Sequence, residues 1–494
     1  MNAPVRTPIS IASLVAVVLT AAGEAFSSPF LSRLATVPVD GAEIVAYDPA
    51  TNCAFVTSGA RVVTVRLGAG DDPAIVRSSD LRELVPGAGE VSHVAVDPAG
   101  RGFLAVTVLP ILRAHEPGRV VFLSTRTGRP LGSVPVGHNP DACAFDAAGT
   151  RLVVANEGEP TAIGGVVIDP PGSVSVVRLD RVRDAGGLAA LDAASVVTLY
   201  PALAAPPAGV RIHPRNAASP SLDLEPESIA ILDDEAWITC QENDAILRVD
   251  LRIPAITALA GLGRVERTVD ARADGRIEID DVRPALSMPD QIAAFRHRDG
   301  RAFLLTADEG DARGVIGRDR TPLADVRRPS KDEALVCAFS PAPAPLTGAR
   351  SVSVFDASSL VRVADTGSRF ERETAARMPA WFNADVDGEK VEPDARSRAR
   401  GPEPEGLAVG VVAGRRYAFC TLERPGAIAV LDLEEPTAPA LVELLPTAPD
   451  GDLGPEGVCF VRPDDTPTGA AWLLVGFEGS GTLAVLRVGT TLLR

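Results

Sequence analysis

The sequence has fewer basic than acidic residues, 48 Lys and Arg against 65 Asp and Glu. Only two of its 48 basic residues are lysines, Lys331 and Lys390, and the formal net charge is −17. This charge disfavours binding to nucleic acid or to anionic membranes, which requires clustered Lys and Arg. Aromatic residues make up 4% of the chain, too few for platforms that stack sugars or single-stranded nucleic acid. We therefore expect no nucleic-acid partner.

The sequence also lacks the short motifs that identify common enzymes. It contains no HExxH, GxSxG, GxxxxGK[ST] or GxGxxG pattern and only five histidines. The six cysteines form no CxxC pair, no zinc spacing and no CxxCH haem site. Most of them fall in apolar, strand-like runs, so we expect buried thiols, although an exported protein would permit disulfides. Whether the protein is an enzyme stays open at this point.

The first residues are typical of a secretory signal peptide. Arg6 precedes the apolar run 9–22, which is too short for a comfortable membrane span, and the small residues Gly23 and Ala25 suit a signal peptidase. We expect residues 1–25 to be removed, with an uncleaved N-terminal anchor as the alternative. After cleavage we expect no stable insertion into the membrane.

The main signal in the sequence is a repeat. A short apolar strand, usually opened by an acidic residue, recurs seven times, and each copy continues through a turn into a second and often a third strand. The seven copies are 42–47, 91–96, 140–145, 226–231, 289–294, 404–409 and 455–460. Short strands, Gly and Pro turns and almost no helical periodicity predict an all-β fold, a single seven-bladed β-propeller spanning residues 31–490.

The chain termini are expected to close the ring. The segment 34–39 resembles 131–136, the outer strand before the third repeat, and no such strand follows the last repeat. We therefore expect an N-terminal strand to complete the last blade, which would bury both sheet edges. Four stretches exceed the repeat and predict long insertions between strands, at about 182–225, 252–288, 311–349 and 371–404.

Acidic residues occupy two equivalent positions of the repeat. In a propeller blade the first strand lies beside the channel and the second runs antiparallel to it, so the start of the first and the end of the second share one face. At first-strand starts lie Glu43, Asp141, Glu227, Asp290, Glu405 and Glu456, and after second strands lie Glu157, Glu242, Glu309, Glu423 and Glu478. These carboxylates should ring one mouth of the channel, more densely toward blades three to seven.

Carboxylates crowded in this way have raised pKa values or need counter-cations. One interpretation is structural, with the glutamates accepting backbone N–H bonds between blades, and a catalytic role is another. A third is a cation site, for which a hard divalent ion such as Ca²⁺ fits best. The predicted metal ligands are Glu157, Glu159, Glu227, Glu242, Asp290, Glu309, Asp311, Glu405, Glu423 and Glu456. Arginines near the ring could neutralise it instead, namely Arg313, Arg396, Arg398 and Arg424.

Several phrases of the sequence, taken in order, resemble one family. They include GAEIVAYDPATNCAFVTSG, EPESIAILDDEAWITCQENDAILRVDL, MPDQIAAFRHRDGRAFLLTADEGDAR, GPEPEGLAVG and GPEGVCF, and they span about residues 41–488. This set resembles the choice-of-anchor I proteins, also described as mesenchyme-specific cell-surface-glycoprotein-like. The resemblance implies an extracytoplasmic propeller that is often held by a C-terminal anchor. This sequence ends soon after the last blade, which favours release.

Three functions are compatible with these observations. The leading one is a secreted or periplasmic, monomeric, non-catalytic binding or scaffold protein whose acidic mouth holds Ca²⁺ or a basic partner. The alternative is a metal-dependent phosphoesterase, similar to alkaline phosphatases and phytases, in which Arg313 or Arg424 binds the phosphate of the substrate. A propeller with a quinone-type redox cofactor is a third and weaker alternative.

Overall fold

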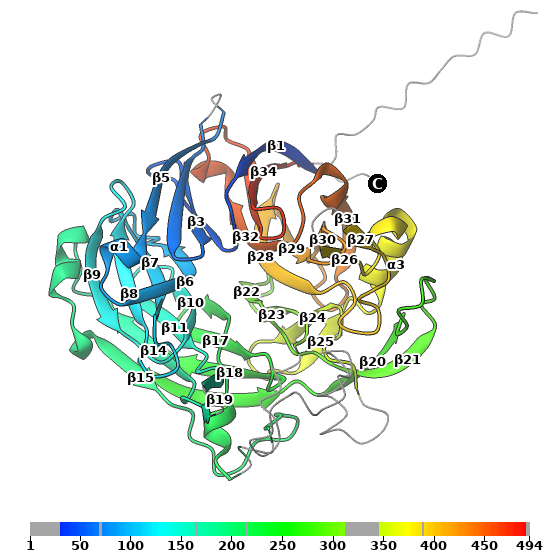
Figure 1. Cartoon of the computed structure of the whole chain (residues 1–494), viewed down its shortest axis with the longest axis horizontal. Helices are drawn as coiled ribbons and strands as arrows, with labels where there is room; N and C mark the ends of the chain where they lie inside the picture. The colour runs from blue at the N-terminus through cyan, green and yellow to red at the C-terminus, as the bar shows by residue number, and fades with distance from the viewer. Residues whose placement is uncertain are drawn as a thin grey trace, which may run out of the picture.

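The computed structural model describes residues 30–68, 72–163, 166–213, 216, 218–311, 345–387 and 390–490. The proposed signal peptide, residues 1–25, lies outside these ranges. The described chain is all-β, with seven four-stranded antiparallel sheets arranged as blades around a central channel (Figure 1). The predicted seven-bladed β-propeller is therefore confirmed.

Each blade is a meander in which strands follow one another from the channel outward. Blades 1 to 3 contain β2 (Val45–Asp48), β3 (Cys53–Ser58), β4 (Arg61–Arg66) and β5 (Ala74–Asp80); β6 (Ala88–Val96), β7 (Phe103–Pro110), β8 (Arg119–Ser124) and β9 (Pro130–Pro135); β10 (Pro140–Phe145), β11 (Arg151–Asn156), β14 (Ser173–Arg178) and β15 (Val196–Leu199). Blades 4 and 5 contain β16 (Ile229–Leu232), β17 (Glu235–Cys240), β18 (Ala245–Asp250) and β19 (Ala255–Gly261); β22 (Ile292–Arg296), β23 (Ala302–Ala307), β24 (Val352–Asp356) and β25 (Arg362–Asp365). Blades 6 and 7 contain β28 (Pro404–Val412), β29 (Arg415–Leu422), β30 (Ala427–Asp432) and β31 (Ala440–Pro446); β32 (Pro455–Val461), β33 (Ala471–Phe477), β34 (Thr482–Val488) and β1 (Leu31–Pro38).

The ring closes as the sequence predicted. Strand β1 pairs antiparallel with β34, from Leu31 opposite Val488 to Pro38 opposite Thr482, and so forms the outer strand of blade 7 (Figure 1). The first and last parts of the described chain thus share one sheet. This pairing removes an exposed strand edge where the ends of the chain meet.

The core lies between neighbouring blades. Every residue of β3, β7 and β33 is buried, because both faces of a second strand pack against adjacent sheets. These strands accordingly read as continuous apolar runs without strict alternation. One hydrophobic cluster joins blades 5 and 6 through Phe303, Val354 and Ala429, and similar clusters join other pairs of blades. This packing holds the first strands rigidly around the channel.

Three additional hairpins and a few short helices decorate the blades. They are β12 (Thr161–Ile163) with β13 (Val166–Ile168), β20 (Arg264–Val269) with β21 (Asp281–Leu286), β26 (Asp385–Asp387) with β27 (Lys390–Glu392), α1 (Leu81–Leu84), α3 (Arg369–Arg377), and the 3₁₀ turns η1 (Ala185–Ala190), η2 (Ala193–Ser195), η4 (Pro220–Asp223), η7 (Pro379–Trp381), η8 (Ala448–Asp450) and η9 (Pro463–Asp465).

Two of the four expected insertions also contain regular blade structure. The outer strand β15 lies within 182–225, and the outer strand β19 lies within 252–288. Both strands are half-exposed and lie in stretches rich in Pro, Arg, Asp and Ala, so the sequence did not distinguish them from loops. The range 371–404 holds most of α3 and the β26–β27 hairpin, whereas 311–349 falls mostly outside the described residues.

Candidate functional site: an acidic channel mouth

The channel end at which first strands begin and second strands end is called the mouth here. A cavity of about 640 Å³ occupies the channel and is lined by acids from the starts of five first strands. They are Glu43, Asp141, Asp290, Glu405 and Glu456. The repeat therefore places these carboxylates around one opening, as the antiparallel order of strands requires.

A recurring bulge sets the position of each acid. In blade 4, Glu227 and Ser228 both lie opposite Thr239, since the N–H of Glu227 donates to the Thr239 carbonyl and the Thr239 N–H donates to the Ser228 carbonyl. The hydroxyl of Thr239 accepts the N–H of Ser228 at 3.0 Å and donates to the main-chain carbonyl of Asp290 in blade 5 at 2.8 Å. Bulges re-aim side chains, and this threonine links the bulges of neighbouring blades.

Blade 6 repeats the arrangement with Thr421. Its hydroxyl accepts the N–H of Gly406 and donates to the Glu456 carbonyl in blade 7 at 3.1 Å. A Cβ on Gly406 would lie 1.8 Å from that same carbonyl oxygen. Blade 7 is similar, since a Cβ on Gly457 would lie 2.4 Å from the Glu43 carbonyl oxygen. In blades 6 and 7, therefore, the close approach of the next blade requires glycine after the acid.

The acids of the mouth have raised pKa values, chiefly because they are buried and further because they repel one another. Burial raises the pKa of Asp141 and Asp290 to about 7 each, and neighbouring carboxylates add to the effect. Burial, followed by the carboxylate of Glu478, raises the pKa of Glu456 to about 10. Burial likewise raises the pKa of Glu157 and Glu227 well above the usual range. Such a group of acids binds protons or cations readily.

Three of these carboxylates form a tight group, called the open cluster. Glu157, Glu227 and Glu242 each offer an oxygen, and these oxygens lie within 4.8 Å of one another. Asn139 donates to the Oε2 atom of Glu157 at 2.6 Å. The Oε2 atoms of Glu227 and Glu242 are buried without a hydrogen-bond partner. Among the described residues, the charged groups that act most strongly on Glu157 and Glu227 are other carboxylates.

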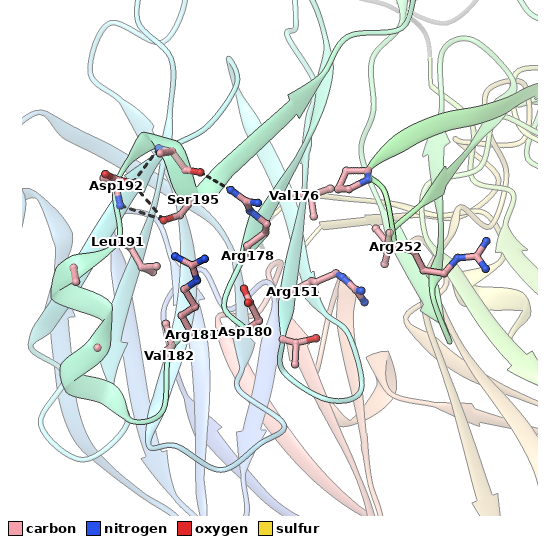
Figure 2. Close-up of a pocket in the computed structure, with 16 residues that line it drawn as sticks. Arg151, Val176, Arg178, Asp180, Arg181, Val182, Leu191, Asp192, Ser195 and Arg252 are labelled. Carbon is pink, nitrogen blue, oxygen red and sulfur yellow. Dashed lines mark hydrogen bonds between the residues drawn. The ribbon is translucent and has the colours of Figure 1, made fainter.

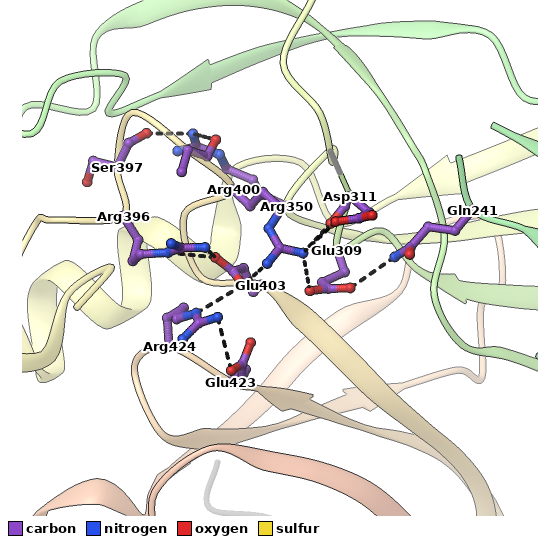
Figure 3. A network of polar contacts seen from close by, with 12 residues as sticks. Gln241, Glu309, Asp311, Arg350, Arg396, Ser397, Arg400, Glu403, Glu423 and Arg424 are labelled. Carbon is purple, nitrogen blue, oxygen red and sulfur yellow. Dashed lines mark hydrogen bonds and ion pairs between the residues drawn. The ribbon is translucent and has the colours of Figure 1, made fainter. Parts of the chain in front are cut away.

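A second group, called the filled cluster, lies next to the open cluster, in blades 5 and 6. Oxygens of Asp290, Glu309 and Glu405 also lie within 4.8 Å of one another. Here an arginine is present, since the Nη1 atom of Arg400 contacts the Oε1 atom of Glu309 at 2.7 Å (Figure 3). Gln241 donates to the other oxygen of Glu309 at 2.9 Å. Burial raises the pKa of Glu309 to about 8, while Arg400 acts in the opposite direction.

Glu403 organises the arginines beside the filled cluster. Its Oε1 atom accepts from Arg396 at 2.7 and 3.0 Å, and its Oε2 atom contacts Arg424 at 2.9 Å and Arg400 at 3.0 Å (Figure 3). Burial alone would raise the pKa of Glu403, but the three guanidinium groups outweigh it and hold the pKa below its usual value. Glu403 is therefore a buried carboxylate that is ionised at neutral pH.

A buried arginine fixes the segment that carries this network. Arg350, 1% exposed, pairs with Glu371 of α3 at 2.6 Å and donates to the carbonyls of Ser397 and Ala399 at 2.6 and 3.0 Å. Gly401 has a φ of +66°, and a Cβ there would lie within 2.9 Å of the Arg350 guanidinium. These contacts flank Arg400 and hold its backbone in place.

The remaining predicted ligands lie around these two clusters. Glu159 is exposed at the rim of the mouth, where the surrounding protein still removes part of the water from its carboxyl and raises its pKa. Asp311 is half-buried, with its Oδ1 atom 3.7 Å from Arg400, and Glu423 belongs with Glu309 and Glu403 to a third set of oxygens within 4.8 Å. Glu456 lies beside Glu478. All ten predicted ligands thus lie on the mouth side of the propeller.

The predicted arginines have different surroundings. Arg424, expected to bind a substrate, contacts Glu403 and Glu423 at 2.9 and 3.2 Å. Arg398 is exposed, and Arg313 lies outside the described residues. Sequence reasoning missed Arg400 and Glu403. A signal for Glu403 existed, because the triplet Glu-Pro-Glu occurs at 225–227 in blade 4 and again at 403–405 in blade 6.

A different cavity, of about 820 Å³, lies at the opposite ends of the strands, where β11 begins and β18 ends. Its lining combines four arginines, Arg151, Arg178, Arg181 and Arg252, with two aspartates, Asp180 and Asp192 (Figure 2). Arg151 pairs with Asp146 and Asp234 at 3.3 and 3.0 Å, and Arg178 donates to the Ala194 carbonyl at 2.8 Å. None of the predicted ligands lines this cavity. The candidate site is therefore the mouth.

Comparison with known protein families agrees with this architecture. The model of the choice-of-anchor I domain matches residues 43–340 and 343–436. The chain belongs to the choice-of-anchor I family. Choice-of-anchor domains are found in exported, surface-anchored proteins. Among the residues that the structure describes, no helix has the length and apolar character needed to cross a membrane.

Two curated relatives of this choice-of-anchor I protein match only in part. Gigasin-3a of Magallana gigas is 28% identical over 159 residues, which cover 28% of this chain and 56% of that protein. The mesenchyme-specific cell surface glycoprotein of Strongylocentrotus purpuratus is 37% identical over 76 residues, 14% of this chain and 10% of that protein. The chain thus spans about half the length of the first relative and a tenth of the second.

Solved structures align over most of the chain at low identity. A chain of Kuenenia stuttgartiensis hydrazine synthase aligns with a TM-score of 0.48 and 12% identity, over 92% of this chain and 97% of that one. The Cps50 (Swd1) propeller of Myceliophteria thermophila aligns with a TM-score of 0.47 and 9% identity, over 93% and 100% of the two chains.

Proposed function

We propose that this choice-of-anchor I protein is an exported, non-catalytic binding protein whose acidic mouth holds Ca²⁺. We expect it to act as a monomer in a secreted or periplasmic location, with the ion or a basic partner segment as its ligand. Family membership supports export and surface association. The rest of the proposal depends on the chemistry of the mouth.

The open cluster is the observation that carries the proposal. Ca²⁺ binds carboxylate oxygens at about 2.3–2.6 Å, so oxygens on opposite sides of the ion are about 4.6–5.2 Å apart. The oxygens of Glu157, Glu227 and Glu242 lie within 4.8 Å of one another, a spacing compatible with one shared ion. The unpartnered Oε2 atoms of Glu227 and Glu242 favour a cation further. Waters and main-chain carbonyls would complete the six to eight ligands of Ca²⁺.

Titration calorimetry of the chelator-stripped full-length protein with Ca²⁺ tests the proposal. We expect heat of binding and, at a free concentration 100 times the dissociation constant, a stabilisation of about 2.7 kcal/mol against unfolding. Glu227→Gln should weaken binding at least tenfold, since it removes one charged ligand. The matched control Glu83→Gln changes an exposed side chain of α1 and should bind like the wild type. Absence of both heat and stabilisation would disprove the proposal.

The phosphoesterase alternative requires a cationic group that is available to a phosphate. Arg424, the candidate within the described residues, is already paired with Glu403 and Glu423. A phosphate would have to displace one of these carboxylates, which does not favour this function. Turnover of a generic aryl phosphate with added Ca²⁺, Mn²⁺ or iron, lost in Glu405→Gln, would establish it nonetheless.

A further inference from the structure

We infer that Arg400 is a built-in cation that fills a second cation position of the mouth, formed by Asp290, Glu309 and Glu405. As a result, the mouth accepts one divalent ion fewer than its carboxylates could hold. The inference that the open cluster holds an ion depends on the proposed function. The role inferred for Arg400 does not depend on it.

The two clusters are built from corresponding parts of the propeller. The open cluster combines an acid from the start of a first strand, Glu227, with Glu157 and Glu242, which follow second strands. The filled cluster combines Asp290 and Glu405 from first-strand starts with an acid that follows a second strand, Glu309. Each offers three carboxylate oxygens within 4.8 Å, so each has the donor set of a hard-cation site.

Arg400 contacts one carboxylate of the filled cluster directly, Glu309, and its charge also acts on Asp290. Its Nη1 atom lies 2.7 Å from Glu309 and 2.6 Å from the Gly310 carbonyl, and its Nη2 atom lies 3.0 Å from Glu403 (Figure 3). Its side chain is only 16% exposed. Acid and carbonyl oxygens around one positive charge are also the ligands of Ca²⁺, so the guanidinium takes the place of an ion.

Oxygens remain available in the filled cluster if Arg400 is removed. The Oε2 atom of Glu405 is buried and has no hydrogen-bond partner, and removing Arg400 frees the Oε1 atom of Glu309, whose Oε2 atom accepts from Gln241. Removing Arg400 should leave the surrounding structure in place, because Arg396 and Arg424 still hold Glu403. The site that results would take a divalent cation with carboxylate ligands.

Arg400 is a fixed constituent of the mouth. Arg350 binds the carbonyls of Ser397 and Ala399 on the N-terminal side of Arg400, and Gly401 packs against Arg350 on the other side. These buried contacts tether the guanidinium near Glu309 and keep its effective concentration high. Free Ca²⁺ therefore competes poorly for this cluster and binds the open one.

Equilibrium dialysis with radioactive Ca²⁺ at pH 8 counts bound ions per chain directly. We expect Arg400→Met in the full-length protein to bind one ion more than the wild type, because methionine keeps the bulk of the side chain and removes its charge. Arg400→Lys keeps a positive charge and should bind the same number of ions as the wild type. Adding Glu309→Gln to Arg400→Met should return the number to the wild-type value.

The four results separate the two proposals. One bound ion in the wild type and two in Arg400→Met would support both proposals. No bound ion in the wild type and one in Arg400→Met would support the role of Arg400 and disprove the ion in the open cluster. One bound ion in each protein would overturn the role of Arg400 and leave the proposal of Ca²⁺ binding intact. No bound ion in either protein would overturn both proposals. If Arg400→Met does not fold, Glu309→Gln alone decides, since loss of the wild-type ion in that variant would place the ion in the filled cluster and refute the inference.

Discussion

Glu403→Gln should be the most destabilising single charge removal in the described mouth. The carboxylate is completely buried and contacts three guanidinium groups, from Arg396, Arg400 and Arg424. A glutamine can keep its amide oxygen toward Arg396. Its NH₂ group then faces the N–H donors of the other two arginines, at positions where an acceptor is needed.

The cost can be worked from these contacts. Hydrogen bonds to charged groups contribute about 1.5–3 kcal/mol each, and two of them, to Arg400 and Arg424, are lost. Both arginines keep a second carboxylate partner, Glu309 and Glu423 respectively, which offsets part of the loss. We therefore expect a loss of about 3 kcal/mol, at the low end of the range of about 3–5 kcal/mol for breaking a buried ion pair.

Urea unfolding followed by tryptophan fluorescence measures this loss. Trp381 lies in η7, in the same insertion as Glu403, and reports on that region of the fold. The control Glu392→Gln removes an exposed partner of Lys390 and should change the free energy of unfolding by about 1 kcal/mol or less. A loss below about 1 kcal/mol for Glu403→Gln, equal to that of the control, would refute the reasoning on buried guanidinium contacts.

Three further predictions concern the channel and the contacts between blades. Burial raises the pKa of Asp141 and Asp290 to about 7 from 3.8, so between these values the native protein holds protons that the unfolded chain has released. The urea midpoint of the calcium-free protein should therefore fall as pH rises from 4 to 8. A midpoint that rises over this range would contradict the prediction. Gly406→Ala places a Cβ 1.8 Å from a carbonyl oxygen of the next blade and should lower the free energy of unfolding by about 3 kcal/mol or more. In the control Gly187→Ala the nearest contact of the new Cβ is at 3.5 Å, so the free energy of unfolding should change by less than about 1 kcal/mol. Thr239→Val removes the hydroxyl that hydrogen-bonds to the main chains of blades 4 and 5. It should lower the free energy of unfolding, measured by the same urea unfolding, by about 1–3 kcal/mol. An unchanged midpoint would show that this hydroxyl does not join the blades.

The fold could be predicted because the repeat is a local signal. Each apolar second strand is buried on both faces, so its sequence is continuous and recognisable, as in Phe103–Pro110. The similarity of 34–39 to an outer strand predicted the closing contact between β1 and β34 correctly. Outer strands such as β15 and β19 were not recognised, because they are half-exposed and lie within long stretches whose composition is that of loops.

The sequence by itself determined that acids gather at one end of the channel. Strand order and direction follow from the repeat, so Asp141, Asp290 and Glu405 had to line the same opening. What only the tertiary structure decided is which acids of the mouth have an arginine as counter-ion. Arg400 reaches Glu309, 91 residues away in the chain, because Arg350 and α3 fold the insertion back over blade 5. No local pattern encodes such a contact, since it depends on where a long insertion packs.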